Sequence, residues 1–334
     1  MDKRTHPKFE YNVDHIKSAV TKERLGGLAF INLASNGETL LADESIELIT
    51  AFLELGHIVQ IISNGTLTEK INMLTELPDE YKSRLIFMNS FHYLEFKRLN
   101  MLGTVFSNLN NMKNAGISTA MLMTLNKEYI PYLEEIKNSC IENFGVVPKI
   151  QLSYELKGNE WTVEEFYSQD IAKMVEKLFD AKEIAINDTY LYGVKRTEFC
   201  YAGDWSFCLN LVNGDISSCP GSQVYQNIFK DLNQPIKFEP VAKNCHADYC
   251  SCGNVLQSLG ITPDLTYYPN YFEMFLENGY YSETIKSALS KKLYTTNKEY
   301  SDTDKEEIDK KVKQQKQRKR NSSIFDYILR KLKK

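Results

Sequence analysis

The sequence predicts an α/β protein: a parallel sheet with crossover helices, followed by a small cysteine-rich β module. Two observations predict it. Up to Lys182, short apolar runs alternate with amphipathic stretches at a spacing of about 30 residues, the pattern of a parallel sheet with right-handed crossovers. That alternation then stops, and six of the seven cysteines follow within 53 residues.

Five strands are expected, each followed by a helix. The strands are the runs at 28–33, 58–62, 85–88, 117–125 and 146–154, and the helices lie at 44–55, 68–77, 96–115, 128–144 and 163–179. Residues 58–62 are largely β-branched, which is typical of a strand buried on both faces of a parallel sheet. A helix at 12–24 precedes the first strand. We therefore expect that a strand pairing with 28–33 is missing.

The second half of the chain is expected to fold differently. Residues 199–212 alternate in polarity, and Asn213-Gly214-Asp215 is a hairpin-turn signal, so a hairpin carrying Cys200, Cys208 and Cys219 is predicted. A loop, a short helix and an aromatic stretch at 267–281 follow. The predicted divisions are the α/β body at 1–182, the cysteine-rich module at 183–265, an aromatic-rich extension at 266–300 and a charged, flexible basic tail at 301–334.

Composition narrows the function classes. The hydrophobic fraction of 43% and the charged fraction of 25% are those of a soluble globular protein. No run of 18 apolar residues occurs, and the first residues lack the apolar segment of a secretory signal, so no transmembrane segment and a cytoplasmic location are expected. Residues 310–334 carry eleven Lys or Arg and one acid. The rest is acidic, which argues against broad nucleic-acid binding.

The basic end has two interpretations. It is a solvated extension, or its apolar residues at 324–332 form amphipathic turns that contact anionic lipid or RNA.

The clustered cysteines predict a metal centre. Their odd number, in a chain without a secretory signal, argues against a disulfide framework. A [4Fe–4S] cluster needs four thiolates, and the spacing offers Cys200, Cys219, Cys245 and Cys250, with Cys252 as a substitute for Cys250. The alternatives are a zinc ion, which also binds four cysteines or three with His246, and purely structural thiols. Cys208, between apolar neighbours, is expected in the core.

Small polar residues follow the first three strands: Ser35-Asn36-Gly37-Glu38, Ser63-Asn64-Gly65-Thr66 and Asn89-Ser90-Phe91-His92. Ligands of parallel α/β proteins bind at such carboxyl ends of strands. Glu38 is the strong acceptor of the first loop, and a solvated carboxylate at a helix start is its alternative interpretation. Asn64 and Ser90 also suit ordinary turns, and His92 suits a polar strand end.

Together these residues resemble the radical SAM enzymes that carry a C-terminal SPASM- or Twitch-type cysteine-rich module. The resemblance covers about residues 10–265. Ser35–Glu38 stands where the family has Gly-Gly-Glu, which holds the amino group of S-adenosylmethionine. Residues 63–66 look like the family's T-N-G-T, and Ser90-Phe91-His92 lies where polar residues approach the ribose or the substrate.

The resemblance implies a partial (β/α) barrel that lacks its first strand, and it favours an auxiliary [4Fe–4S] cluster over zinc. It implies that S-adenosylmethionine is bound by Ser35, Asn36, Gly37, Glu38, Thr39, Asn64, Ser90 and His92. In an intact relative, reductive cleavage of that cofactor gives a 5′-deoxyadenosyl radical, which takes a hydrogen from the substrate. Peptide, carbohydrate and small-molecule substrates all remain open.

The sequence departs from the family in two places. The C-x3-C-x2-C motif, which would follow the missing strand and hold the catalytic cluster, is absent from residues 1–334, and Asn36 replaces the first glycine of Gly-Gly-Glu. Either the sequence starts too late or the gene has lost that end. We expect this polypeptide alone not to cleave S-adenosylmethionine, which it would use if the missing part were supplied. The alternatives are a non-catalytic iron–sulfur or zinc-binding interaction protein, and a zinc-stabilised adaptor.

Overall fold

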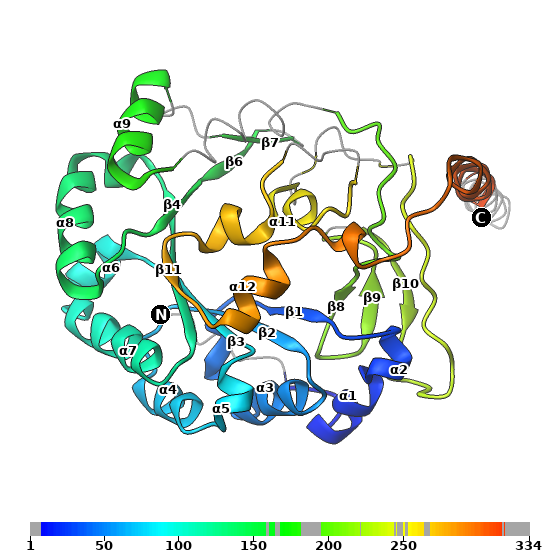
Figure 1. Ribbon diagram of the computed structural model, residues 1–334, viewed down its shortest axis with the longest axis horizontal. Coiled ribbons are helices and arrows are strands. Elements are labelled where there is room, and N and C mark those ends of the chain that lie inside the picture. Colours follow the sequence, from blue (N-terminus) through cyan, green and yellow to red (C-terminus); the bar gives the residue numbers. More distant parts are fainter. Residues whose placement is uncertain are drawn as a thin grey trace, which may run out of the picture.

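The structure is a computed structural model. It describes residues 8–157, 160–163, 168–181, 195–220, 222–243, 245, 250, 253–263, 268–315 and 317. Within these residues the chain forms a six-stranded sheet lined on one side by helices, a three-stranded antiparallel sheet and a two-stranded hairpin (Figure 1).

Five parallel strands confirm the predicted sheet. They are β1 (Phe30–Leu33), β2 (Ile58–Ser63), β3 (Leu85–Ser90), β4 (Ser118–Leu125) and β5 (Lys149–Leu152), hydrogen-bonded in sequence order. Among the described strands β1 is an edge strand, as the sequence predicts. Closure of this sheet into a partial barrel stays a prediction.

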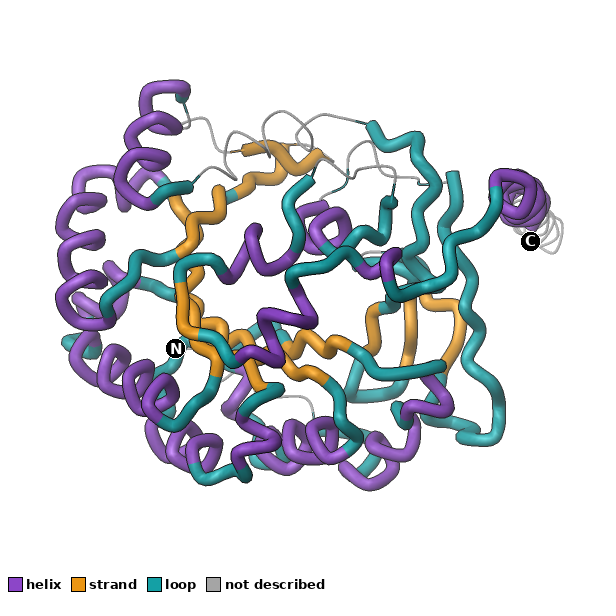
Figure 2. Tube along the Cα trace, in the orientation of Figure 1, coloured by secondary structure: helices purple, strands orange, loops and turns teal. Residues whose placement is uncertain are grey.

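Helices line the outer side of the sheet (Figures 1 and 2). They are α1 (Val13–Ala19), α2 (Lys22–Leu25), α3 (Ser45–Glu54), α4 (Thr68–Thr75), α5 (Asp79–Lys82), α6 (Tyr93–Arg98), α7 (Leu102–Asn114), α8 (Leu133–Phe144) and α9 (Gln169–Phe179). Alternate strand residues, such as Val59, Ile61, Leu85 and Phe87, are buried in the same core as the apolar faces of these helices. The alternation of the sequence thus produces the layer that it predicts.

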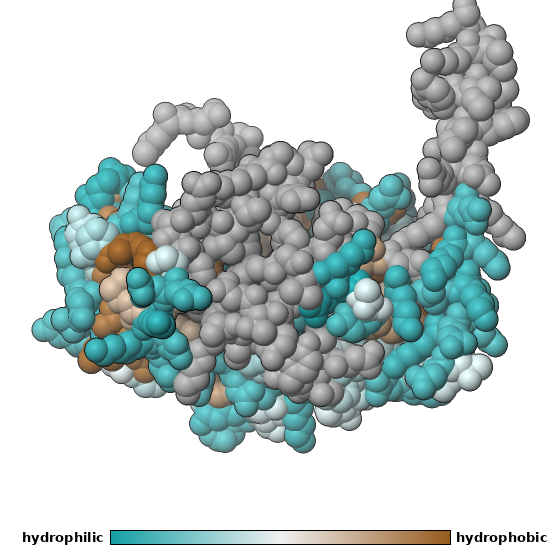
Figure 3. Space-filling view, turned by 90° about the horizontal axis from the view of Figure 1, so that it is seen from above, coloured by the Kyte–Doolittle hydropathy of each residue, from teal (hydrophilic) through white to brown (hydrophobic). Residues whose placement is uncertain are grey.

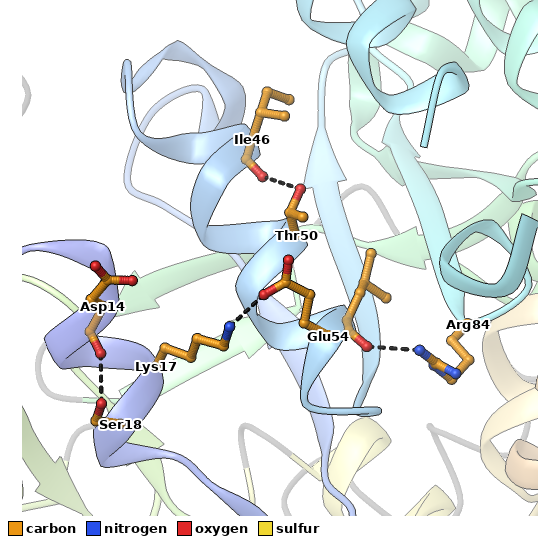
Figure 4. Close-up of polar contacts among 8 residues, drawn as sticks. Asp14, Lys17, Ser18, Ile46, Thr50, Glu54 and Arg84 are labelled. Atoms are coloured by element: carbon orange, nitrogen blue, oxygen red, sulfur yellow. Dashed lines mark hydrogen bonds and ion pairs between the residues drawn. The ribbon is translucent and has the colours of Figure 1, made fainter. Parts of the chain in front are cut away.

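The predicted helix at 12–24 is two helices. The first, α1, ends at Ala19. Thr21 caps α2 by accepting a hydrogen bond from the Arg24 amide (3.4 Å), and Gly26 closes α2 in the left-handed conformation. Polar contacts fix this corner (Figure 4): Lys17 of α1 pairs with Glu54 of α3, and Arg84 donates to the Leu53 carbonyl (2.7 Å).

The predicted strand at 146–154 and the helix expected from residue 163 need correction. After β5 the backbone forms an antiparallel hairpin of β6 (Tyr154–Lys157) and β7 (Glu160–Val163). The helix α9 begins later because the Ser168 side chain caps it, accepting from the Ile171 amide (3.4 Å).

The inner side of the sheet is covered by residues 268–289, which we call the inner cover. It contains a π-helical turn (Phe272–Leu276), β11 (Gly279–Tyr280) and α12 (Glu283–Leu289), and β11 pairs antiparallel with the start of β4. Inner-face residues share a second core with it: Phe30, Ile58, Ile62, Ile86, Met88, Ala120 and Leu122 pack with Tyr268, Tyr271, Met274, Phe275 and Ile285. The expected aromatic extension is therefore part of the body.

The cysteine-bearing region contains a short antiparallel sheet. Its strands are β8 (Cys208–Leu209), β9 (Asp215–Ser217) and β10 (Val224–Asn227), in the order β10-β9-β8. Gly214 makes the β8–β9 turn at φ +85°, and a Cβ there would lie 2.3 Å from the Phe229 ring, so the turn needs glycine. The predicted hairpin is present, but its first strand is two residues long. The helix α11 (Gly253–Ser258) follows.

The charged tail is helical where the structure describes it. Residues 302–315 form a helix, whose Ile308 and Val312 pack against the second core. Asp309 accepts a hydrogen bond from the Lys243 amide (3.1 Å) and pairs with Lys313 (2.6 Å). These residues are therefore ordered into a helix that contacts the body, and flexibility of the segment from 301 stays a prediction. The apolar residues at 324–332 lie outside the described residues.

The coloured surface seen from above is mainly hydrophilic, and hydrophobic residues gather at the left end, where α8 and α9 lie in Figure 1 (Figure 3). Ile141 of α8 and Met174 of α9 are among the exposed large apolar side chains. No helix in the described part of the chain is both long and apolar enough to cross a membrane.

Candidate functional site

A hollow of about 290 Å³ lies at the carboxyl ends of β1, β2 and β3. Its lining residues are Ser35, Gly37, Glu38, Ile62, Ser63, Asn64, Ser90 and His92. Six of the eight predicted cofactor-binding residues are in this set, and Asn36 and Thr39 are not. Ile62 and Ser63 were not among the predicted cofactor-binding residues, although Ser63 begins the predicted loop at 63–66 and Ile62 precedes it.

The Glu38 carboxylate is held in place at this hollow. Its Oε1 accepts hydrogen bonds from the Leu40 amide (3.0 Å) and the Ser63 hydroxyl (2.7 Å), and its Oε2 accepts from the Asn64 amide (2.9 Å). The bond to Leu40 caps a 3-10 turn (Thr39–Leu41). A carboxylate accepts about four hydrogen bonds. These three contacts therefore leave a position on Oε2 for a ligand donor.

Asn64 and Ser35 shape the two loops beside Glu38. Asn64 Oδ1 accepts hydrogen bonds from the amide and the hydroxyl of Thr66 (2.9 and 2.7 Å). These bonds fix the side-chain amide of Asn64, whose Nδ2 is a hydrogen-bond donor. Ser35 Oγ accepts from the Gly37 amide (3.2 Å) in the same kind of local turn. Together with Ser90 at the end of β3, these groups give the hollow hydroxyl and amide functions next to one carboxylate.

The loop after β2 is held by buried side chains of β3 and α7. Gly65 has φ +73°, and a Cβ there would lie 2.6 Å from Asn89 Nδ2. Asn89 Nδ2 donates to the Ser63 carbonyl (3.3 Å), and Asn108 Nδ2 donates to the Gly65 carbonyl (2.9 Å). Both asparagines are buried. The loop that presents Ser63 and Asn64 is therefore fixed by the two strands and the helix around it.

His92 lies on the rim, at the start of α6. Desolvation by the surrounding protein lowers the pKa of its imidazole, and the nearby carboxylates of Glu95 and Glu38 act in the opposite direction. Because its ordinary pKa is about 6.5, a lowered value makes His92 neutral at pH 7. It then offers the hollow one donor and one acceptor.

The cysteines predicted to bind a metal are brought together in part. Cys200 is joined to Ala242 by an isolated β-bridge, which brings it beside the segment that leads to Cys245. Burial raises the pKa of the Cys200 thiol to about 11, and the Cys245 and Cys219 thiols add to the increase. Cys245 and Cys250 are half-buried.

Among the described residues, however, no three His, Cys, Asp or Glu side chains are arranged to hold a metal ion. Cys252 and His246 lie outside those residues. Cys208 is half-buried in β8, and Cys140 is buried in α8, where burial raises its pKa.

The fold and the hollow define a parallel α/β protein with a polar site at the carboxyl ends of its strands. No protein-family model and no curated protein matches the chain.

Three crystal structures of Streptococcus suis SuiB are similar in fold. SuiB alone has a TM-score of 0.47 at 14% identity over 66% of this chain and 58% of SuiB. SuiB bound to S-adenosylmethionine has a TM-score of 0.47 at 14% identity over 68% of this chain and 59% of SuiB. SuiB bound to the precursor peptide SuiA has a TM-score of 0.46 at 15% identity over 66% of this chain and 56% of SuiB. The chain thus spans less than two thirds of SuiB.

Proposed function

We propose that this chain is a radical SAM-type protein and that the strand-end hollow binds S-adenosylmethionine. One observation carries the proposal: the Glu38 carboxylate is held at the hollow by Ser63 and Asn64, with an acceptor position left on Oε2. The ligand's α-ammonium group donates to this oxygen.

Electrostatics favour such a ligand. S-adenosylmethionine carries an ammonium and a sulfonium charge, and a charge-assisted hydrogen bond is about twice as strong as a neutral one. Because Glu38 is already oriented, binding does not have to order its side chain. Asn64 Nδ2 and Ser90 Oγ serve as partners for the ligand's carboxylate or ribose hydroxyl groups, and His92 stays neutral beside the cationic ligand.

The family's reductive cleavage requires a cluster held by C-x3-C-x2-C, a motif that residues 1–334 do not contain. The proposal for this polypeptide is therefore confined to binding. The alternative is a non-catalytic iron–sulfur or zinc-binding interaction protein without affinity for the cofactor.

Calorimetric titration with S-adenosylmethionine tests the hollow. We expect wild-type protein to bind and Glu38→Gln to bind at least about tenfold more weakly, because the neutral amide loses the charge-assisted bond. Glu69→Gln, at the exposed start of the neighbouring helix α4, is the matched control and should bind like wild type. No binding by wild type, or an equal loss in both variants, contradicts the proposal.

We also propose that Cys200, Cys219, Cys245 and Cys250 hold an auxiliary [4Fe–4S] cluster, with Cys252 as a substitute for Cys250 and zinc as the alternative metal. The bridge between Cys200 and Ala242, which brings Cys200 beside the segment that leads to Cys245, supports this set, as does the effect of the Cys245 and Cys219 thiols on the pKa of Cys200. A cluster would supply electron transfer or substrate coordination. The protein would contribute the thiols, and a bound cation would reverse the raised pKa of the Cys200 thiol.

Metal analysis after anaerobic reconstitution tests this centre. We expect about four irons and four sulfides per chain, and loss of both in Cys200→Ser. Cys208→Ser, which alters a half-buried cysteine outside the set, should keep them. Zinc without sulfide supports the alternative metal. Wild-type protein that takes up neither metal contradicts both.

A further inference from the structure

We propose that Ser63 is a positioning residue that orients Glu38 for the ammonium group of the ligand. This inference rests on the proposed binding of S-adenosylmethionine, and it concerns a residue of the predicted loop at 63–66 that is not among the predicted cofactor-binding residues.

Ser63 is the last residue of β2, and it is 3% exposed. Its hydroxyl donates to Glu38 Oε1 (2.7 Å) and accepts from the Gly65 amide (3.1 Å). A serine hydroxyl has one hydrogen. Because that hydrogen is used on Glu38, Ser63 acts on a ligand through the carboxylate.

The other hydrogen bonds of Glu38 do not replace this contact. The Leu40 amide is two residues away in the same loop, so it moves with Glu38. The Asn64 amide holds the opposite oxygen, Oε2, which is the one that has room for a ligand. Without the Ser63 hydroxyl, Oε1 keeps a single local donor in the described part of the chain. The carboxylate can then rotate, and Oε2 no longer points consistently into the hollow.

Ser63 is itself rigidly supported. It pairs with Asn89 in the parallel ladder of β2 and β3, and the Asn89 side chain donates to the Ser63 carbonyl (3.3 Å). The Glu38 carboxylate, on the loop after β1, is thus held by the end of β2, which is paired on both sides in the sheet. A binding group held by a second residue on a rigid element keeps its geometry better than one held by its own loop.

The test separates the ammonium contact from general damage. S-adenosylmethionine and an analogue with hydrogen in place of the α-amino group are titrated into wild type and Ser63→Ala. We expect Ser63→Ala to weaken binding of S-adenosylmethionine by about tenfold and to leave the analogue within about twofold, because the analogue does not use Glu38. In a Glu38→Gln background, Ser63→Ala should cause no further loss. Ser63→Thr, which keeps the hydroxyl, should restore binding.

The possible failures are distinguishable. If wild type does not bind S-adenosylmethionine, the proposed function and this inference both fall. If wild type binds and Ser63→Ala weakens both ligands equally, the inference alone falls, because the side chain is then merely structural. Should Ser63→Ala not fold, the same comparison is made with Ser63→Cys, whose thiol is a weak donor of similar size.

Discussion

The two faces of the main sheet are covered in different ways. The outer face meets helices that follow their strands directly in sequence. In β2 and β3 its residues are apolar until the strand ends, where Ser63 and Asn89 support the hollow. The inner face meets the inner cover, which comes from the other end of the chain. There the buried Gln60 of β2 and Tyr271 exchange two hydrogen bonds (2.7 and 3.0 Å).

The difference teaches that the two faces depend on different interactions. The outer layer is a hydrophobic core built from neighbouring segments, so its stability follows buried apolar volume. The inner layer joins residues that are 211 positions apart, and a polar pair fixes their register. Buried polar groups are costly when they lose their partners. The inner layer should therefore respond to the loss of a single hydroxyl.

Truncation of a buried side chain on the outer face should have the largest effect on the free energy of unfolding. Phe87 of β3 is fully buried beneath the helices. We expect Phe87→Ala to lower the free energy of unfolding by about 3–5 kcal/mol, because it leaves a cavity in a packed core. Chemical denaturation measures this value. Met73→Ala, at an exposed apolar residue of α4, should change it by less than about 0.5 kcal/mol. Similar losses in both variants would mean that the outer face is not the main core.

Removal of the Tyr271 hydroxyl, on the inner face, should have an intermediate effect on the free energy of unfolding. Tyr271→Phe keeps the ring that packs against Phe30 and removes the hydroxyl that Gln60 uses. We expect the free energy of unfolding to fall by about 1–3 kcal/mol, the usual cost of an unsatisfied buried polar group. Tyr132→Phe, at an exposed tyrosine, is the control. An unchanged stability in Tyr271→Phe would show that the polar pair does not hold the inner cover.

The same contrast explains which features could be predicted from the sequence. The helices of the outer layer and the polar residues of the hollow were predictable because each lies next to its strand, so local periodicity carries the signal. The inner cover was not, because nothing near Gln60 indicates a tyrosine 211 residues later. The helix at 302–315 was missed because its charged sequence buries little beyond Ile308, Asp309 and Val312. Ser63 was not among the predicted cofactor-binding residues because its role depends on Glu38, which lies on the loop after another strand.

The smallest effect on the free energy of unfolding is expected from a change in pH. It should come from a residue on the outer face of the sheet, which the helices cover. His57 is fully buried at the start of β2: its Nδ1 accepts from the Ala29 amide (3.1 Å), and its Nε2 donates to the Val20 carbonyl (2.9 Å). A ring nitrogen that accepts from an amide cannot carry a proton, so His57 is neutral. Burial lowers its pKa, Lys22 and Arg84 lower it further, and the bond to Val20 opposes them.

Because the folded pKa lies below the unfolded value of about 6.5, the unfolded chain binds the proton first as the pH falls. The free energy of unfolding should therefore fall between pH 7 and pH 5, by roughly 1 kcal/mol for each unit by which the pKa is lowered. His92, whose pKa is also lowered, contributes in the same direction. Denaturation curves across this range measure the slope, which should shrink in His57→Gln, whose amide can both accept from Ala29 and donate to Val20. The inner pair of Gln60 and Tyr271 has no group that titrates in this range, so Tyr271→Phe should keep the wild-type slope. An unchanged slope in His57→Gln would assign the acid sensitivity elsewhere.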